Sequence, residues 1–365
     1  MGLAVTLEFL NAAHGDAIMA SWGRPKRLAL IDGGPSGKFD LALGPRLREL
    51  RAERTEAEDD PLVLDLVYVS HIDDDHIAGI VRLLRDLRRK QRDQLPLPYR
   101  VKRLWHNSFE EIIAAAAQEA SVSQIVSELE QMSQRAQVVA ASVNQGRDVR
   151  DLARALGVAG NAPFGGPITG GMSADIGGLN YTIVAPDQGA LDALETVWRE
   201  AKRRKEPEVL AQAFADRRVP NLSSLSSVVG GPKGRALLTA DARGDHVMKG
   251  LEETGLMTPG GSAHFDVFQV PHHGSQNNSD QVLYERVTAD HYIISADGVA
   301  NPHPSPDTLT WITNARGADG YAIHLTNPIP AAMNQLQQLA TGRNFTVEAR
   351  TDPQKGITVT FEATA

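Results

Sequence analysis

The pattern of apolar and polar residues predicts short strands at the start of the chain. Apolar runs separated by polar or glycine-rich breaks indicate strands over residues 3–10, 17–22 and 27–31, the last ending at Asp32-Gly33-Gly34-Pro35. Residues 62–69 are apolar except for Asp65, as expected for a strand buried on both faces. A helix is predicted over 77–94, because apolar residues recur there at helical spacing opposite a row of arginines.

The remaining chain continues to interleave helices and strands. Residues 109–140 are rich in Ala, Gln, Ser and Glu and predict a helix, whereas residues 157–178 contain eight glycines and predict a mobile loop. We interpret residues from about 107 to 178 as an insertion. Further strands are predicted over 179–185, 224–229, 235–239, 266–270, 291–295 and 321–326, followed by a C-terminal helix and a closing hairpin (345–350 with 357–361) within about 330–365. This order predicts layered α/β packing in one domain over 1–365.

Composition narrows the classes of function. The 365 residues are 42% apolar and 22% charged, so the chain can bury a sizeable core. Cysteine is absent, which excludes disulfides, thiolate zinc sites and a cysteine nucleophile. The formal net charge of -8 argues against coating nucleic acid through bulk charge. No secretory signal or membrane-length apolar run is present, so we expect no membrane contact and a cytoplasmic location.

The segment Ser70-His71-Ile72-Asp73-Asp74-Asp75-His76 places two imidazoles and three carboxylates directly after a predicted buried strand. Packing these groups together costs desolvation and like-charge repulsion, and a divalent cation is the usual compensation. The alternative is a solvated acidic turn whose Asp residues cap the next helix. Capping accounts for one aspartate and not for the whole set, so we favour metal binding.

Three more polar clusters each follow a predicted strand. Asp241 ends one strand, the pair His272 and His273 ends another, and Asp297 leads into His303 after a third. Five of the 11 histidines lie in these clusters and in the first one. Sites of α/β proteins form at the carboxyl ends of strands, so we expect the four clusters to converge.

The ordered motifs resemble those of the metallo-β-lactamase superfamily, in the version found in its ComEC-type branch. That branch includes the hydrolase domain of the competence DNA-uptake protein and stand-alone relatives. The resemblance covers residues 1 to about 325 and rests on Leu30-Ile31-Asp32-Gly33-Gly34, His71-x-Asp73-x-Asp75-His76-x-x-Gly79, Leu238-Thr239-Ala240-Asp241, His272-His273-Gly274-Ser275 and His303-Pro304, with His14-Gly15-Asp16 and residues 221–227 also fitting.

The resemblance implies a fold and a set of metal ligands. The fold is an αββα sandwich of two mixed β-sheets flanked by helices, with two divalent metal ions at one edge. The implied ligands are His71 and Asp73 for the first ion, Asp75, His76 and one of the pair His272/His273 for the second, and Asp241 as the bridge. We favour His272 as the ligand and His273 as the group facing substrate. Asp32 and Asn221 are expected to orient the ligands from behind.

Two departures from the family pattern bear on the metal. Residues 219–224 lack the third histidine that many members use for the first metal, and Asp73 replaces another histidine. The ligand set therefore shifts toward oxygen, which makes manganese or magnesium a rival to zinc. Ala240 stands where the family commonly has glycine, a change that we expect to matter little.

The implied activity is metal-dependent hydrolysis, with a phosphodiester or nucleic acid as the favoured substrate. In this hypothesis Asp75 positions the nucleophile, and His303 or His273 contacts the phosphate or protonates the leaving oxygen. Arginines after the metal turn could follow a nucleic-acid backbone, although a solvated helix face explains them better. A nucleotide, phosphate ester or lactone is the alternative substrate. A third interpretation is a metal-stabilised subunit that docks a protein partner through residues 109–140.

Overall fold

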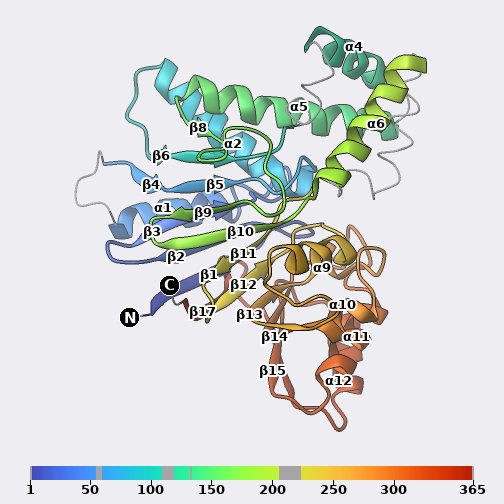
Figure 1. Cartoon of the computed structure of the whole chain (residues 1–365). Helices are drawn as coiled ribbons and strands as arrows, with labels where there is room; N and C mark the ends of the chain where they lie inside the picture. The colour runs from blue at the N-terminus through green and yellow to red at the C-terminus, as the bar shows by residue number, and fades with distance from the viewer. Residues whose placement is uncertain (1, 55–59, 109–118, 132–133, 205–222, 364–365) are drawn as a thin grey trace.

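The computed structural model describes residues 2–54, 60–108, 119–131, 134–204 and 223–363. Their strands form two large mixed sheets that pack face to face, with helices on both outer sides (Figure 1). This is the αββα sandwich that the motifs led us to expect. No helix in these ranges is long and apolar enough to cross a membrane.

The first sheet has seven strands, antiparallel from β17 to β3 and parallel from β3 to β8. Its central strands β2 and β3 are almost wholly buried, because helices cover one face and the second sheet covers the other. In spatial order the strands are β17 (Ile357–Ala363), β1 (Leu3–Phe9), β2 (Ile18–Trp22), β3 (Arg27–Ile31), β5 (Leu66–Tyr68), β7 (Arg103–Trp105) and β8 (Ala159–Gly160).

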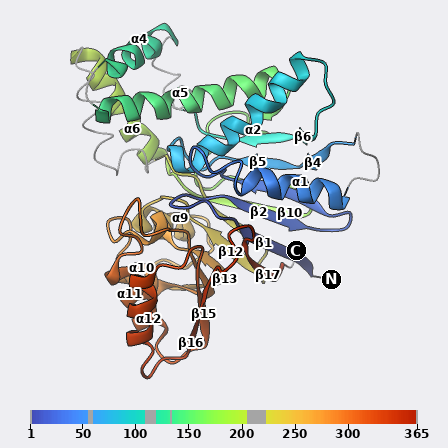
Figure 2. The same ribbon diagram turned by 180° about the vertical axis from the view of Figure 1, so that it is seen from behind.

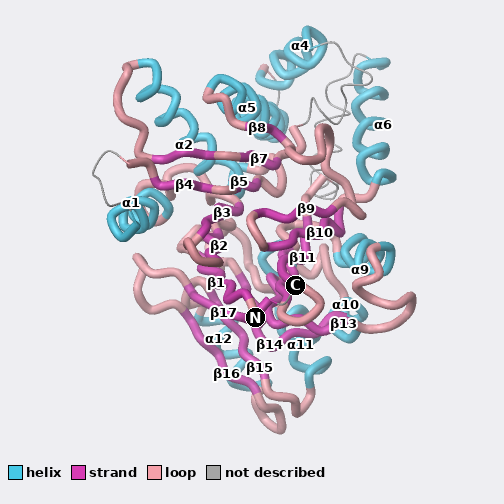
Figure 3. Tube along the Cα trace, turned by 60° about the vertical axis from the view of Figure 1, so that its left-hand side comes forward, coloured by secondary structure: helices cyan, strands magenta, loops and turns pink. Residues whose placement is uncertain are grey.

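The second sheet has eight strands, parallel from β16 to β12 and antiparallel from β12 to β9. Figure 3 shows the strands of both sheets stacked between the helices. In spatial order they are β16 (Phe345–Ala349), β15 (Tyr321–Leu325), β14 (Val287–Ile294), β13 (Ala263–Gln269), β12 (Arg235–Leu238), β11 (Ser226–Gly230), β10 (Leu179–Ala185) and β9 (Ser173–Ile176).

Helices form the two outer layers, which lie at opposite ends of the view in Figure 2. Over the first sheet lie α1 (Leu43–Arg54), α2 (Asp74–Arg92), α4 (Glu119–Glu130), α5 (Gln134–Ala155) and α6 (Gln188–Arg204). Over the second sheet lie α9 (Gly244–Glu253), α10 (Gln281–Arg286), α11 (Pro306–Arg316) and α12 (Pro330–Leu339). The core between the sheets is rich in aromatic residues, and Trp105 of the first sheet meets Tyr181 of the second edge to face at 5.4 Å.

The predicted strand over 62–69 is divided by Asp65. β4 (Leu62–Leu64) leaves the main sheet and pairs with β6 (Tyr99–Val101), while β5 stays in it. Asp65 is buried between them and accepts hydrogen bonds from Arg27 at 3.0 Å and Lys102 at 2.8 Å. A buried carboxylate is costly unless cations pair with it, and the break in the strand at Asp65 places its side chain between these two.

The prediction of a closing hairpin between residues 345–350 and 357–361 is wrong. β16 pairs with β15 at the edge of the second sheet, whereas β17 crosses over and pairs with β1 in the first sheet. The side chains of β17 alternate between buried and exposed, which suits an edge strand with one face on the core. The terminal strand thus lies beside the first strand, and the two ends of the chain are close together (Figure 1). The predicted C-terminal helix is present as α12.

Two other expectations need correction. Residues 119–155 form two helices, α4 and α5, and the second continues well past residue 140. The glycine-rich stretch 157–178 is not all loop, because it contributes β8 and β9 to the two sheets. Residues 109–118 of the predicted helix lie outside the described residues. The helix predicted over 77–94 is present as α2, but it begins earlier, at Asp74, within the polar segment.

Candidate metal centre

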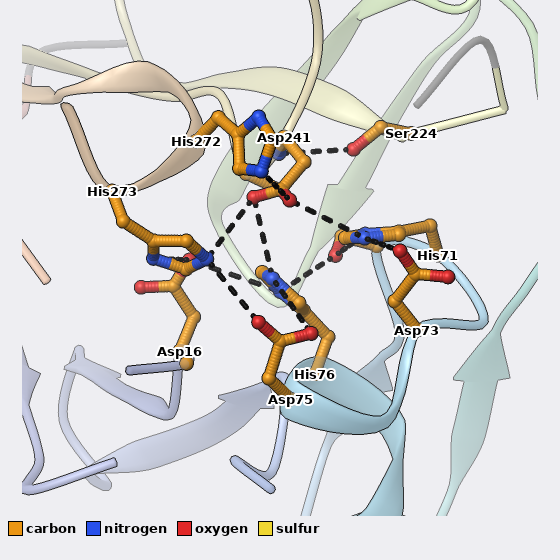
Figure 4. Close-up of polar contacts among 12 residues, drawn as sticks. Asp16, His71, Asp73, Asp75, His76, Ser224, Asp241, His272 and His273 are labelled. Carbon is orange, nitrogen blue, oxygen red and sulfur yellow. Dashed lines mark hydrogen bonds and ion pairs between the residues drawn. The ribbon is translucent and has the colours of Figure 1, made fainter. Parts of the chain in front are cut away.

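Loops at the carboxyl ends of strands from both sheets converge on one buried cluster. His71 and Asp73 follow β5, and Asp75 and His76 lie in the first turn of α2. From the second sheet, Asp241 follows β12, and the pair His272 and His273 lies in the 3₁₀ turn (Pro271–Gly274) after β13. Figure 4 shows these side chains pointing toward one another around Asp241.

The two oxygens of Asp241 face different histidines. Oδ1 lies 3.3 Å from Nε2 of His76 and 3.4 Å from Nε2 of His273. Oδ2 lies 3.3 Å from Nε2 of His272 and 3.7 Å from Nε2 of His71. One carboxylate therefore stands between two pairs of imidazoles, which is the position of a bridging ligand.

Each oxygen also has a second carboxylate nearby. On the Oδ1 side, Asp75 lies 3.9 Å from Nε2 of His76 and 3.5 Å from Nε2 of His273. On the Oδ2 side, Asp73 lies 3.8 Å from Nε2 of His71. We call Asp75, His76 and His273 the Oδ1 group, and Asp73, His71 and His272 the Oδ2 group.

The spacing of these atoms suits a divalent cation better than hydrogen bonding. Ligand atoms bound to one ion at about 2.1 Å lie roughly 3–4 Å apart, and the separations above fall in that range. In the described part of the chain, Nε2 of His71, His76 and His273 and Oδ1 of Asp241 are buried without a hydrogen-bond partner. Buried polar atoms that converge in this way are costly unless something binds them. The donor set therefore fits a divalent cation, and the ligand atoms that lie within 4.8 Å of one another are those of Asp16, His76, Asp241 and His273.

The other ring nitrogen of every imidazole has an acceptor. Nδ1 of His76 donates to Asp32 at 2.9 Å, and Nδ1 of His273 donates to the carbonyl oxygen of Ser295 at 2.7 Å. Nδ1 of His272 lies 2.6 Å from the amide oxygen of Asn278. Such bonds place the proton on Nδ1 and leave the Nε2 lone pair for a metal.

Asp32 lies behind the histidines and holds two of them. It accepts bonds from the backbone and hydroxyl of Ser70, both at 2.7 Å, in addition to the bond from His76. Because the Ser70 hydroxyl donates to Asp32, it can accept from Nδ1 of His71, 3.0 Å away. One carboxylate thus orients an imidazole of each group.

The arrangement of the His272/His273 pair differs from the expected one. His273 is the ring that lies beside Asp75 and His76, and it is buried. His272 lies on the opposite oxygen, on the side of His71. The turn that carries them explains the difference, because both residues have a positive φ, 47° and 57°, and their side chains diverge. Each group therefore contains two imidazoles, and the Oδ2 group is not as poor in nitrogen as the missing third histidine suggested.

Asp16 is a member of the cluster that the sequence analysis did not identify as a site residue. It lies in the loop between β1 and β2, and its ligand atoms group with those of His76, Asp241 and His273 within 4.8 Å. Its Oδ2 is 3.7 Å from Nδ1 of His76, and its Oδ1 is buried without a hydrogen-bond partner among the described residues. The segment His14-Gly15-Asp16 fitted the family motifs, but a single aspartate in a hairpin loop is also an ordinary turn residue, so no ligand role was assigned to it.

Other polar residues lie around the cluster or beyond it. His303 lies beside His272, with ring centroids 5.8 Å apart and the ring planes tilted by 58°, and the residue is partly exposed. Ser224 accepts a bond from the backbone nitrogen of Asp241 at 3.2 Å (Figure 4). His106 is buried after β7 and belongs to neither group. Asn221 lies outside the described residues.

Two loops of the first sheet and the start of α2 pack closely against one another at the cluster. Gly33 donates to the carbonyl of His76 at 2.7 Å, and Asp16 donates to the carbonyl of Asp75 at 3.1 Å. A Cβ on Gly79 would lie 1.9 Å from the carbonyl oxygen of Gly33, and one on Gly15 would lie 1.9 Å from that of Asp75. Only glycine permits these backbones to approach so closely, which explains Gly79 in the metal motif.

Left-handed backbone conformations also gather at the site. Asp32, Ala240, His272 and His273 have φ values between 45° and 57°, a region that residues other than glycine seldom adopt. Strained backbone of this kind clusters at functional sites. Ala240 is thus held in a conformation that glycine adopts more readily than alanine does.

We expect Ala240→Gly to stabilise the protein by about 1 kcal/mol, because glycine adopts this φ of 45° without strain. Chemical denaturation of the two metal-free proteins measures the difference. Ala242→Gly, which changes a nearby buried alanine without a positive φ, is the control and should destabilise. An equal loss of unfolding free energy in both variants would contradict the assignment of strain to Ala240.

The charges of the cluster are strongly coupled in the metal-free protein. Burial lowers the pKa of His71 to about 4. Burial also opposes the charge on His273, but Asp241, Asp75 and Asp16 outweigh it and raise its pKa to about 9. The same balance raises the pKa of His76 well above the usual value. Burial disfavours the carboxylate of Asp241, yet the facing imidazoles hold its pKa well below the ordinary range. Protons on His76 and His273 thus occupy the place of a cation.

We expect the metal-free protein to be most stable near pH 6.5. The raised pKa of His273 contributes stability that is complete below 6.5 and is lost as pH rises through about 9. His71 has a lowered pKa, so the unfolded chain takes up its proton first and stability falls as pH drops from 6.5 toward 4. Thermal melts of chelator-treated protein across this range measure both slopes.

Two controls distinguish deprotonation of His273 from a general effect of pH on stability. Metal-loaded protein should lack the alkaline loss, since the ion replaces the protons. His273→Gln should reduce that loss in metal-free protein. A metal-free stability that stays level or rises between pH 6.5 and 9 would refute the role given to His273.

No family model matches the chain, and a search of curated proteins finds no match. Among solved structures, the chain is similar to the crystal structure of the metallo-β-lactamase fold protein YhfI from Bacillus subtilis. That similarity covers 99% of this chain and 100% of the other, at 12% identity and a TM-score of 0.42. What defines the class of this protein is its own geometry, an α/β sandwich of two mixed sheets with a buried His/Asp cluster compatible with metal binding.

Proposed function

We propose that this protein is a metal-dependent hydrolase with two divalent ions on either side of Asp241. The observation that supports this most directly is the convergence of four imidazole Nε2 atoms on the two oxygens of one buried carboxylate. A network that served only the stability of the fold would satisfy these atoms with hydrogen bonds. Here Asp73, Asp75 and the bridging Asp241 supply the oxygen ligands.

The ligand groups make zinc and manganese the favoured metals. Each group offers two imidazoles and two carboxylates when Asp241 is counted in both, and this mixed set suits zinc or manganese better than magnesium. Divalent ions in such a site supply Lewis acidity and lower the pKa of water, which makes hydroxide available at neutral pH. Asp16 adds a further carboxylate on the Oδ1 side.

The protein's own residues position water and substrate. The pKa of Asp75 is low because His76 and His273 outweigh its burial, so it is a carboxylate at neutral pH and can orient a water molecule through Oδ1 or Oδ2. His303 lies beside His272, with ring centroids 5.8 Å apart, and both of its ring nitrogens are buried, so they face the interior of the site. An imidazole there can donate the proton that the leaving oxygen needs.

A phosphodiester is the substrate we favour, because paired divalent ions suit in-line displacement at phosphorus. The charges on α2 support a small substrate as the alternative. Arg82 and Arg89 pair with Asp86 at 3.2 Å, Arg85 pairs with Asp148, and Arg92 pairs with Asp93 at 3.0 Å. Arginines that already pair with carboxylates release few counterions on binding a polymer. Binding of a nucleotide, phosphate ester or lactone would not need a row of unpaired cations along α2.

A protein partner docking on residues 109–140 remains a prediction of a different class. Within the described part of that segment, α4 and the start of α5 pack on each other above the first sheet. This hypothesis requires that metal-loaded protein cleaves nothing and that a partner co-purifies only while the segment is intact.

We expect His303→Ala to reduce hydrolysis about 100-fold to 1,000-fold while the bound metal is unchanged, because the variant loses a proton donor and no ligand. Elemental analysis and the rate at saturating substrate measure the two effects. His264→Ala removes an exposed histidine on β13 and is the matched control. A wild-type rate in His303→Ala would remove this residue from the mechanism.

The activity itself is tested with metal-stripped protein resupplied with zinc, manganese or magnesium. Substrates are end-labelled single- and double-stranded DNA and RNA, a chromogenic phosphodiester, a phosphomonoester and a lactone. We expect phosphodiester cleavage that needs the metal and disappears in Asp75→Ala. Strong salt dependence would indicate a polymer, since only polymer binding releases many counterions. Metal binding without cleavage of any substrate would contradict the proposal.

A further inference from the structure

A cavity lies away from the proposed metal centre, between α1, α2 and the start of β6. Its volume is about 590 Å³, which is within the usual range of small-molecule sites. Its lining contains none of the residues of the Oδ1 and Oδ2 groups. Residues of α1 and α2 both line the cavity, and Figure 2 shows the two helices on the same outer face of the first sheet.

The cavity has an apolar floor and a charged rim. Phe39, Leu83, Leu87 and Tyr99 are largely buried and form part of its lining. Four cations stand around them, namely Arg48 and Arg51 of α1 and Arg89 and Lys90 of α2. The acidic members of the lining are Asp40 and Asp86.

The rim carries an excess of positive charge. Asp86 is engaged by Arg82 and Arg89, both at 3.2 Å, and Asp40 lies 3.9 Å from Arg82. Considering all described residues, Arg48 and Lys90 form no ion pair with a carboxylate. Two cations at the mouth of the cavity are therefore available to an anion.

The charges of the α1 arginines reach the hydroxyl at the floor of the cavity. Arg48, Arg51 and Tyr99 all line the cavity. Burial raises the pKa of the Tyr99 hydroxyl, while the positive charges of Arg48 and Arg51 act against that increase. A guanidinium group offers several hydrogen-bond donors to one acceptor group.

We propose that this cavity binds an organic phosphate. Its apolar or aromatic body lies against Phe39, Leu87 and Tyr99, and Arg48 and Lys90 hold the phosphate oxygens. A phosphate is favoured over a carboxylate because it presents three acceptor oxygens and up to two charges to the two cations. This site is independent of the metal centre and of the reaction proposed there.

The test is calorimetric titration of the full chain with AMP in the presence of EDTA, which prevents binding through metal ions. We expect saturable binding that weakens about tenfold or more in Arg48→Gln/Lys90→Gln, since two charge-assisted contacts are lost. Ala52→Trp should also weaken binding, because Ala52 is an exposed residue of the lining and a large ring there fills the mouth. Adenosine and inorganic phosphate, used as separate probes, should each bind more weakly than AMP.

Two control variants show whether AMP binds in this cavity or elsewhere on the protein. Arg88→Gln/Arg92→Gln changes the net charge equally on an exposed part of α2 outside the cavity and should leave AMP binding unchanged. Asp241→Asn should also leave it unchanged, which separates this site from the proposed metal centre. The proposal is overturned if AMP shows no saturable binding, if the double variant in the cavity binds like the wild type, or if both double variants weaken binding equally.

Discussion

Asp241→Asn is expected to abolish binding of both metal ions and to lower hydrolysis at least about 1,000-fold. The two oxygens of Asp241 face separate pairs of imidazoles, so this one residue serves both ligand groups. An amide has the same shape, but it lacks the charge and turns a donor toward one of the pairs. Elemental analysis after dialysis against zinc or manganese measures the loss of metal.

The control for this variant is Asp245→Asn, the same substitution at a carboxylate of α9 that pairs with Arg243 at 2.7 Å. It should retain both metal and activity. Circular dichroism and melting curves establish that Asp241→Asn is folded. Two ions per chain in a folded Asp241→Asn protein would show that this carboxylate does not bridge them.

Gly79→Ala is expected to destabilise the protein by about 3 kcal/mol or more and to weaken metal binding with it. The added Cβ would lie 1.9 Å from the carbonyl oxygen of Gly33, and backbone atoms cannot rotate away as a side chain could. Either α2 or the loop that carries Asp32 must shift, and each of them positions His76. Thermal melts and metal titration measure the two consequences.

Gly166→Ala is the matched control, because a Cβ at Gly166 meets nothing within 4 Å and its φ is not positive. Its melting temperature should stay within about 2 °C of the wild type. If Gly79→Ala melts at the temperature of this control, the close approach of the two backbones is not required for the site.

Local patterns were sufficient to predict the elements whose partners are close in sequence. The strands over 3–10, 17–22 and 27–31 appear as β1, β2 and β3, because each presents a clear apolar run between strong breaks. The convergence of three polar clusters was also predictable, since they follow strands of an α/β fold. The fourth contributes only His303, beside His272, whereas Asp297 lies 3.9 Å from His14. This prediction used only the rule that sites of α/β proteins form at the carboxyl ends of strands, which requires no knowledge of distant contacts.

Features that depend on distant partners were not predictable. Asp65 interrupts its strand because it meets Arg27 and Lys102, and nothing next to it in the sequence indicates that contact. β17 pairs with β1 across almost the whole chain, whereas a local pattern favoured a hairpin with β16. The orientations of His272 and His273 follow from their positive φ values, which the residue types do not specify.

The ligands of the proposed centre come from both sheets, with Asp16, His71 and His76 on one and Asp241 and His273 on the other. A long stretch of chain separates the two sets. During synthesis from the N-terminus, β1 to β8 and α2 therefore leave the ribosome long before the second set, whereas β17, the edge strand of the first sheet, leaves it last. Until then His71, His76 and their carboxylates remain an incomplete site, with low affinity for any ion. For the proposed centre we therefore expect metal loading to be a late event, and a nascent chain stalled before residue 241 should not retain zinc.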